Sequence, residues 1–167
     1  MRIFKEKILP KKGSLLIGCL VLLLDQISKF WVLENVSSSE TLNICSCLNF
    51  VLAFNPGITF GLLHAYSNIH YILLVLAVFM LICLVTVWWW KAETILQRYA
   101  TAIILFGALG NLVDRVRLRA VVDFIDFHAF GWHWYTFNLA DSAIVLGVGL
   151  LLLDNFRNTK KLKQRFQ

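Results

Sequence analysis

The chain has 167 residues, enough for a single domain, but its composition excludes an ordinary soluble one. Hydrophobic residues make up 59% and charged residues 16%, against about half and about a quarter in typical soluble domains. The formal net charge is +6. Because the basic residues flank apolar segments, this charge suits anionic lipid headgroups and gives no reason to expect nucleic acid as a partner.

Four apolar segments are candidates for transmembrane helices, which need about 20 residues each. They cover about residues 14–33, 69–90, 99–113 and 139–153. The first follows basic residues, as a secretory signal does, but only residues 14–18 are apolar ahead of a possible cleavage site at Cys19. A signal peptide needs an apolar region of about 7–15 residues, so we expect a retained first helix. The sequence therefore predicts one integral membrane domain, residues 1–167.

The positive residues predict the orientation, because cytoplasmic loops are enriched in Lys and Arg. Basic residues precede the first segment, connect the second to the third and follow the fourth, whereas the long connection after the first has none. Arg115, Arg117 and Arg119 oppose this pattern but are outnumbered. We expect both termini in the cytoplasm, with a loosely ordered basic tail over residues 155–167.

The two connections on the outer side have structure of their own. Within the first, about residues 34–68, apolar side chains alternate over 42–54. This alternation predicts a strand with one buried face, in a small extracytoplasmic sheet. The second, about residues 114–138, is rich in aromatic residues, which prefer the membrane interface. We expect a surface helix or loop there, with Asp126 as a solvated loop charge.

The cysteines and histidines predict neither a metal site nor a cofactor. Cys45 and Cys47 lie on the outer side, but a single intervening residue makes a disulfide between them geometrically poor. The spacing of Cys and His matches no metal-binding pattern. We expect neither a metal nor a cofactor.

Polar residues in three of the predicted helices lie at a common depth. At about 1.5 Å per residue, Asp25, Asn111, Asp114 and Asp141 all fall in the outer half of the bilayer. An ionisable group there costs about 2.5–3.5 kcal/mol or more unless it is paired or hydrated. Asp114 can instead form an interfacial ion pair with Arg115. The matched depth nevertheless predicts a shared polar pocket that opens outward.

Simpler interpretations of the other residues stay open. Asp25 and Lys29 are four residues apart and can neutralise each other on one helix face. Asn138 and Asp141 have the spacing of a helix cap. Asp123 stands among β-branched and aromatic neighbours and has no local partner. These interpretations work singly, but together they leave the common depth unexplained.

Two carboxylates near a membrane surface suit the chemistry of an aspartic protease. Two nearby acids cannot both ionise easily, so one keeps its proton. The ionised acid can take a proton from water while the neutral acid hydrogen-bonds a carbonyl oxygen. No His-Glu-x-x-His run supports zinc, and Ser28 and Lys29 point about 100° apart on a helix, which argues against a dyad.

The alternative is a non-enzymatic transporter or proton-relay subunit that uses intramembrane carboxylates. A relay needs polar residues across the full depth of the membrane, but the helices offer none on the inner side of Asp25 apart from Thr86 near the inner end of the second segment. This asymmetry favours a site that opens on one side only.

Five motifs, in order, resemble a known family. They are Asp25-Gln26-x-Ser28-Lys29, Asn55-x-Gly57-x-x-Phe60, Gly107-x-x-Gly110-Asn111-x-x-Asp114-Arg115, Val122-Asp123-Phe124 and Phe137-Asn138-x-Ala140-Asp141. Together with the four-helix topology they resemble bacterial lipoprotein signal peptidase (signal peptidase II). The sequence departs from the usual pattern at Ile58-Thr59 and at Thr136.

The resemblance implies an aspartic endopeptidase of the bacterial inner membrane, with its active site toward the extracytoplasmic side. Such an enzyme removes the signal peptide from prolipoproteins just before a cysteine that carries a diacylglyceryl group. The implied partners are prolipoproteins and membrane lipids, and we expect a monomer.

By this resemblance Asp123 and Asp141 match the catalytic pair. Asp141 lies near a helix N-terminus, whose dipole favours negative charge, so we expect it to be the ionised member. The positions that match the pocket or the substrate-binding residues are Asp25, Gln26, Lys29, Asn55, Gly57, Phe60, Asn111, Asp114, Arg115, Asn138 and Ala140.

Overall fold

The computed structural model describes residues 2–57 and 67–165. The helices in these ranges are α1 (Arg2–Asn35), α2 (Asn68–Lys91), α3 (Ile95–Leu118) and α4 (Leu139–Arg165). The strands are β1 (Thr41–Cys45), β2 (Leu48–Asn55), β3 (Val121–Ala129) and β4 (Trp132–His133). Each helix contains a stretch long and apolar enough to cross a membrane. The predicted membrane fold, four helices with a small sheet, is confirmed.

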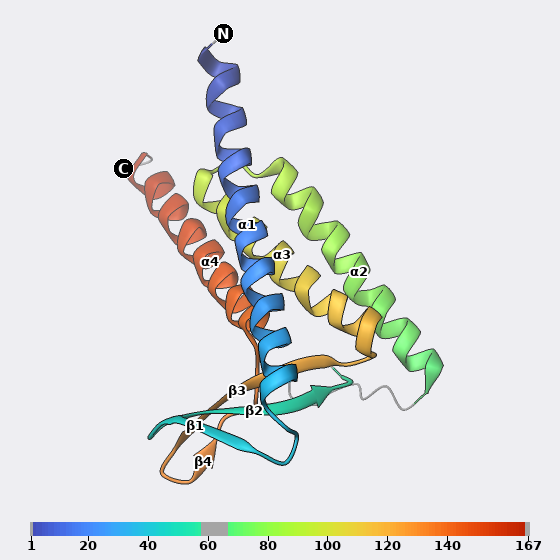
Figure 1. Ribbon diagram of the computed structural model, residues 1–167. Coiled ribbons are helices and arrows are strands. Elements are labelled where there is room, and N and C mark those ends of the chain that lie inside the picture. Colours follow the sequence, from blue (N-terminus) through green and yellow to red (C-terminus); the bar gives the residue numbers. More distant parts are fainter. Residues whose placement is uncertain (1, 58–66, 166–167) are drawn as a thin grey trace.

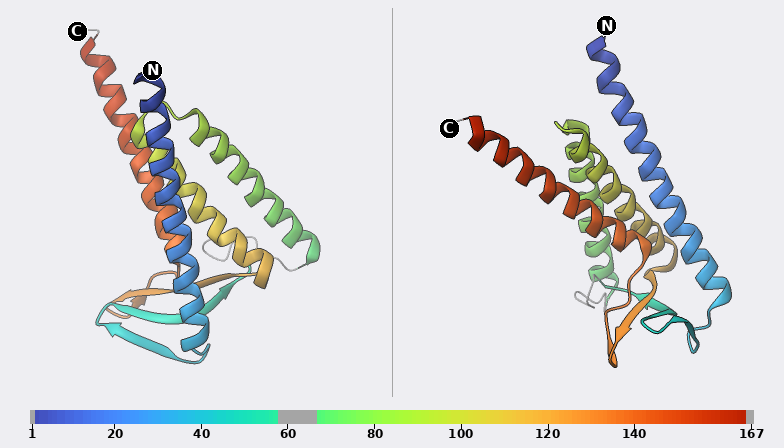
Figure 2. Two further views of the ribbon diagram at one scale, coloured as in Figure 1. Left: turned by 45° about the horizontal axis from the view of Figure 1, so that its top comes forward. Right: turned by 90° about the vertical axis from the view of Figure 1, so that its left-hand side faces the viewer.

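The helices and the sheet occupy opposite ends of the molecule. Both chain ends and the α2–α3 connection lie at one end of the bundle, and the sheet lies across the other end (Figure 1). Further views show α1 and α4 diverging toward the chain ends, while α1, α3 and α4 approach the sheet at the other end and α2 lies to one side of it (Figure 2). The polar residues of the helices therefore meet near the sheet.

Helix α3 lies at the centre of the bundle and contacts each of the other helices. Half of its most apolar window is buried (50%), against 22% for α1, 17% for α2 and 11% for α4. Small residues permit this close packing: a Cβ on Gly107 would lie 2.9 Å from the backbone oxygen of Ala140 in α4. The other three helices leave most of their apolar surface for lipid.

Side-chain caps and one buried hydrogen bond fix the terminal end of the bundle. Thr94 caps α3, and its hydroxyl accepts from Gln97 N at 2.9 Å. The ring nitrogen of Trp89 in α2 donates to the hydroxyl of the fully buried Ser14 in α1 at 3.1 Å. The cap satisfies a backbone N–H that the start of a helix leaves without a partner, and so fixes where α3 begins. The hydrogen bond from Trp89 to Ser14 holds α2 against α1.

The four strands form an antiparallel sheet in the order β1-β2-β3-β4. One face of the sheet packs on the last turns of α1, where Val32, Val36 and Phe124 form a buried cluster. Phe50 in β2 packs edge-on against Phe124, with ring centroids 5.6 Å apart. Between β2 and β3 the register pairs Ala53 with Asp123. The sheet thus holds Asp123 above the helix bundle.

The alternating run over residues 42–54 is a hairpin, β1 and β2, where the sequence predicted one strand. Cys45 pairs with Leu48, so the turn consists of two residues, 46–47. A two-residue turn alone would place odd positions opposite even ones. The register shift between Asn43 and Cys45 brings Leu42 opposite Phe50, so the apolar side chains at even positions of both strands share one face and the sequence pattern hides the turn.

The segment over about residues 114–138 also differs from the predicted surface helix or loop. It contains the end of α3 and the strands β3 and β4. Likewise α4 continues to Arg165, where the sequence predicted a loosely ordered tail. In both cases charged residues end the apolar run, but the helix continues past them, because helix propensity does not depend on hydrophobicity.

Candidate active site

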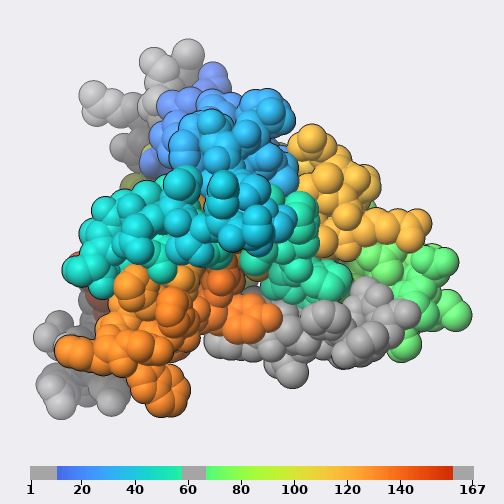
Figure 3. All heavy atoms as spheres, turned by 60° about the horizontal axis from the view of Figure 1, so that its bottom comes forward, coloured from blue at the N-terminus to red at the C-terminus, as the bar shows by residue number. Residues whose placement is uncertain are grey.

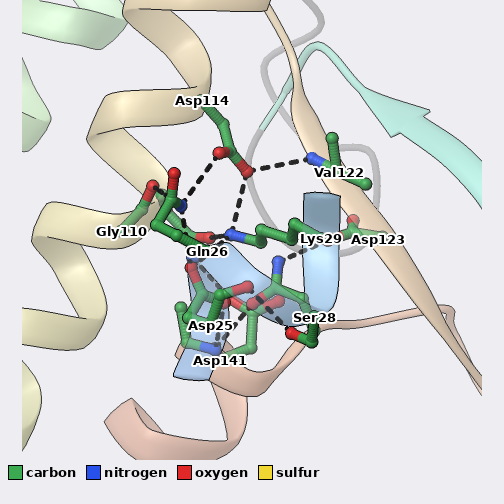
Figure 4. Close-up of polar contacts among 12 residues, drawn as sticks. Asp25, Gln26, Ser28, Lys29, Gly110, Asp114, Val122, Asp123 and Asp141 are labelled. Carbon is green, nitrogen blue, oxygen red and sulfur yellow. Dashed lines mark hydrogen bonds and ion pairs between the residues drawn. The ribbon is translucent and has the colours of Figure 1, made fainter. Parts of the chain in front are cut away.

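A buried lysine on α1 joins two buried carboxylates from α1 and α3 (Figure 4). Lys29 Nζ lies 2.9 Å from Asp25 Oδ2 and 2.8 Å from Asp114 Oδ2. It also donates to Asn111 Oδ1 at 2.8 Å. All three charged residues are at most 2% exposed. Such a cluster is tolerated only when every member is paired, because a lone buried charge is strongly destabilising.

This cluster also holds the backbone at the start of α4 and of β3. Ala140 N donates to Asp25 Oδ1 at 2.9 Å, and Val122 N donates to Asp114 Oδ2 at 3.2 Å. The amide of Gln26 donates to both carboxylates at 3.1 Å. Both backbone donors directly precede the two aspartates predicted to be catalytic. The ion cluster therefore positions the chain on which those aspartates lie.

Two asparagines hold Asp141 and link it to Asp123. Asn111 Nδ2 donates to Asp141 Oδ1 at 2.8 Å, while Asn111 Oδ1 accepts from Lys29. Asp141 N donates to Asn138 Oδ1 at 2.9 Å, the geometry of a cap at the start of α4. Asn138 Nδ2 donates to Asp123 Oδ1 at 2.6 Å. The capping interpretation of Asn138 is thus confirmed, and the same side chain joins the two aspartates.

Asp123 in β3 is a buried carboxylate with an amide on each oxygen. Asn55 Nδ2 at the end of β2 donates to Oδ2 at 3.1 Å, opposite the contact from Asn138. Burial and the negative charge of Asp141 raise the pKa of Asp123 to about 6, against the lowering effect of the two amides. Asp123 therefore holds a proton more readily than an ordinary aspartate.

A cavity of about 310 Å³ brings the two aspartates to one surface. Its polar side is lined by both carboxylates and by Asn55, Asn111 and Arg115. Its apolar side comes from helices α2, α3 and α4 and from the start of β3, and consists of Val78, Leu81, Ala108, Val121 and Ile144. A cavity with one polar and one apolar side suits a peptide segment that enters from the membrane. A second cavity, of about 560 Å³, lies between the helices around Asp154 and lacks both aspartates.

Arg115 braces the pocket rather than pairing with its neighbour in sequence. Its Nη2 donates to the backbone oxygen of Gly57 at 2.5 Å, and Tyr71 in α2 donates to its carbonyl at 2.8 Å. The alternative of an Asp114–Arg115 ion pair is wrong, because Asp114 pairs with Lys29. The simpler interpretation of Asp25, a pair with Lys29, holds within the larger cluster.

The structure gathers the predicted residues that it describes around one site, which extends over α1, β2, α3, β3 and α4. Gly57 N donates to Asn55 Oδ1 at 3.0 Å and so fixes the turn after β2. Phe60, together with the departures at Ile58 and Thr59, lies outside the described residues. Among the described residues, no group of three or more His, Cys, Asp or Glu side chains is placed to hold a metal ion.

The prediction that Asp126 is a solvated loop charge is wrong, because its side chain is buried (6% exposed). It accepts from Asn49 Nδ2 at 3.0 Å and pairs with His133 Nδ1 at 2.9 Å. Burial alone would raise the pKa of Asp126, but these hydrogen bonds outweigh it and lower the pKa below its usual value. Both partners lie far from it in sequence or across a turn, so no local pattern predicts the burial.

Several contributors to the site escaped the sequence analysis. Tyr71 in α2 supports Arg115, and Val78 and Leu81 of the same helix form part of the cavity wall. The other apolar lining residues, Ala108, Val121 and Ile144, were not predicted either. A tyrosine near a helix end is typical of any membrane interface, and apolar residues within a membrane helix give no distinguishing signal.

Gly110 of α3 tests how tightly the ion cluster is packed. A Cβ there would lie 2.5 Å from Asp25 Oδ2 and 3.3 Å from its Cγ. Since Asp25 is held from several sides, we expect Gly110→Ala to destabilise the protein by about 1–3 kcal/mol and to lower activity. The matched control is Gly149→Ala in α4, where the added Cβ meets open space. Thermal unfolding in detergent measures both, and equal melting temperatures would contradict the prediction.

Known proteins resemble this chain in sequence and in fold. A family model described as signal peptidase (SPase) II matches residues 17–157, which include both aspartates and the whole ion cluster. The chain belongs to the signal peptidase II family. Its members are membrane aspartic peptidases that process prolipoproteins.

Individual relatives of this signal peptidase II agree over nearly the full length. The chain is 38% identical over 149 residues to the lipoprotein signal peptidase of Beijerinckia indica, covering 88% of the chain and 89% of the relative. It is 40% identical over 144 residues to that of Shewanella loihica, covering 85% of each. Two solved structures of bacterial membrane enzymes superpose with TM-scores of 0.81 and 0.75, at 26% and 27% identity. They cover 90% and 86% of this chain, and 91% and 92% of theirs.

Proposed function

We propose that this signal peptidase II cleaves diacylglyceryl-modified prolipoproteins just before the lipidated cysteine, with Asp123 and Asp141 as its catalytic pair. One observation carries the assignment of the pair: both carboxylates line the same cavity, although one comes from β3 and the other from α4. The charge of Asp141 also contributes to the raised pKa of Asp123. Two acids so placed can share one proton and one water molecule.

In the proposed reaction Asp141 is ionised and Asp123 carries the proton. The first turn of α4 favours negative charge at Asp141, and the amide of Asn111 donates to it. Asp141 takes a proton from water, whose oxygen attacks the scissile carbonyl carbon, while Asp123 donates its proton to the carbonyl oxygen. Collapse of the diol then returns a proton to Asp123 and passes the proton on Asp141 to the leaving amine.

The seated substrate would favour this proton arrangement. A peptide in the cavity displaces water, and desolvation raises the pKa of a carboxyl further. Asp123 would then keep its proton at neutral pH, although its pKa in the free protein is about 6.

The remaining residues of the site have proposed roles in binding substrate. Arg115 is 7% exposed, and its Nε and Nη1 have no partner among the described residues. These two donors can therefore bind carbonyl oxygens of the substrate. Asn55, Asn111 and Asn138 hold the aspartates directly. The residues of the ion cluster, with Gln26 and Ala140, act behind them as positioning residues.

We place this site on the extracytoplasmic side of the bacterial inner membrane. The basic ends of the chain and the α2–α3 connection lie at the bundle end away from the sheet (Figure 1), and such basic ends face the cytoplasm. The cavity then lies at the depth of the outer leaflet, where a diacylglyceryl anchor holds the scissile bond. In this proposal the chain acts as a monomer, with lipids of the membrane around it.

The test compares a prolipoprotein that carries the diacylglyceryl group with the same protein bearing an unmodified cysteine. Each is incubated with the purified chain in detergent, and products are followed by gel shift and by the mass of the new N-terminus. We expect conversion of the modified protein alone, with the lipidated cysteine as the first residue of the product. Equal conversion of both substrates, or a cut elsewhere, would overturn the proposed specificity.

A further inference from the structure

Two thiols meet at the turn of the β1–β2 hairpin, away from the proposed catalytic site. Cys45 ends β1, Cys47 is the second residue of the turn, and their sulfur atoms are 3.5 Å apart. Both are free and exposed. In the space-filling view of the sheet end, the hairpin (teal) lies at the edge of the molecule beside the orange β3–β4 segment (Figure 3). Reagents in solution can therefore reach both sulfur atoms.

We propose that Cys45 and Cys47 form a reversible dithiol–disulfide site that reacts with disulfides in the surrounding solution. The turn already directs both side chains toward each other, so closure needs the sulfur atoms to approach from 3.5 Å to about 2.05 Å. Small side-chain rotations and a slight adjustment of the turn can supply this. The sulfur contact thus overcomes the obstacle that the one-residue spacing suggested.

The two thiols differ in the way that an attacking and a resolving cysteine differ. A hydrogen bond from the backbone N–H of Cys47, with its thiol, lowers the pKa of Cys45. The hydrogen bond with Cys45 and the charge of that thiolate raise the pKa of Cys47. Because the thiolate is the nucleophile, Cys45 is the first to react.

The reaction is a balanced thiol–disulfide exchange. The Cys45 thiolate attacks one sulfur of an external disulfide, forms a mixed disulfide and releases one thiolate, which takes a proton from water. The Cys47 thiolate then attacks Cys45 sulfur and releases the second thiol. The hairpin loses two protons and two electrons, and the external disulfide takes up the same number and becomes two thiols.

The setting of this site follows from the proposed orientation, on which this part of the inference rests. The sheet end would face the extracytoplasmic space, where disulfides form and persist. Exposed or strained disulfides are easily reduced again, so the closed turn is expected to open in the presence of dithiols. Since β2 starts directly after the turn and ends at Asn55, closure would fix the start of the strand that carries Asn55, a hydrogen-bond donor to Asp123 in β3.

The experiment treats the purified full-length chain in detergent with glutathione disulfide and counts the remaining thiols by maleimide labelling and intact mass. The controls are Cys45→Ser and Cys47→Ser, each of which lacks one partner. We expect the wild-type chain to lose two of its four labelled thiols and two hydrogens in mass, with no glutathionyl group, and dithiothreitol to restore all four. Each variant should instead retain one glutathionyl group, because no second thiol can displace it.

A wild-type chain that keeps a glutathionyl group as the variants do would overturn the proposal, and so would one whose four thiols all remain reactive. Peptidase activity does not enter this readout. Failure of the dithiol site and failure of the proposed peptidase are therefore distinguished.

Discussion

Replacing either aspartate of the proposed pair, as Asp123→Asn or Asp141→Asn, is expected to lower kcat for a diacylglyceryl prolipoprotein by about 10²–10⁴-fold. An amide cannot take a proton from water in place of Asp141, and it cannot deliver one to the carbonyl oxygen in place of Asp123. Single-turnover conversion followed by gel shift measures the loss. Asp126→Asn is the matched control, because Asp126 lies on the same strand, is also buried and does not line the cavity.

At neutral pH the two substitutions on β3, Asp123→Asn and its control Asp126→Asn, are also expected to change stability in opposite directions. Folding raises the pKa of Asp123 from 3.8 to about 6, so the wild-type chain loses stability as pH rises between these values. The full shift corresponds to about 3 kcal/mol. The melting temperature of Asp123→Asn relative to wild type should therefore rise from pH 4 to pH 7. The side chain of the Asp123→Asn variant keeps only one of the two hydrogen bonds that Asp123 accepts. This loss reduces the gain in melting temperature at neutral pH, but it does not change how the difference between variant and wild type varies with pH.

The control behaves differently because the pKa of Asp126 is lowered by folding. A lowered pKa contributes stability above the unfolded pKa, and that stability is lost as pH falls through the folded value. Asp126→Asn should thus be less stable than wild type at neutral pH, with a difference that shrinks in acid, and should still cleave substrate. Full activity in Asp123→Asn or Asp141→Asn, or a melting difference for Asp123→Asn that does not change with pH, would contradict the proposed pair.

The sequence predicts the helices and the depth of the polar residues because both depend on local pattern. An apolar run of about 20 residues and the rise per residue suffice to place Asp25, Asn111, Asp114 and Asp141 in one slab. The hydrogen-bond partners of Asp123 cannot be predicted from such a local pattern. Asn55 reaches it only through the β2–β3 register, which contains an irregularity between Phe50 and Ala53. No local rule fixes such a shift.

Other differences have the same physical origin. Asp126 is buried by Asn49, 77 residues away, and by His133 across a turn. The register shift between Asn43 and Cys45 keeps the apolar side chains of both hairpin strands at even positions, so periodicity cannot reveal the turn at residues 46–47. Contacts between distant segments and breaks that preserve a pattern are what single-sequence periodicity leaves undetermined. The motifs supplied the identities of the site residues, whereas the pairing of Asp114 with Lys29 required the fold.

The second large effect is expected at Lys29. Lys29→Met keeps the length of the side chain but leaves Asp25 and Asp114 facing each other without a cation in a buried site. Breaking a buried ion cluster in this way costs about 3–5 kcal/mol, which corresponds to a fall in melting temperature of roughly 10 °C. Activity should fall as well, because Asn111 loses the donor that orients its amide toward Asp141.

A second variant separates charge from packing in this prediction. Lys29→Met combined with Asp114→Asn removes one of the two unpaired charges, so it should recover part of the lost stability while activity stays low. Lys11→Met at the opposite end of α1 is the control, because Lys11 lies 3.8 Å from the centroid of a Trp90 ring and has no part in the cluster. Two results together would contradict this prediction: Lys29→Met melts at the same temperature as Lys11→Met, and the double variant is no more stable than Lys29→Met. Lys29 would then not stabilise the protein by neutralising the buried charges of Asp25 and Asp114.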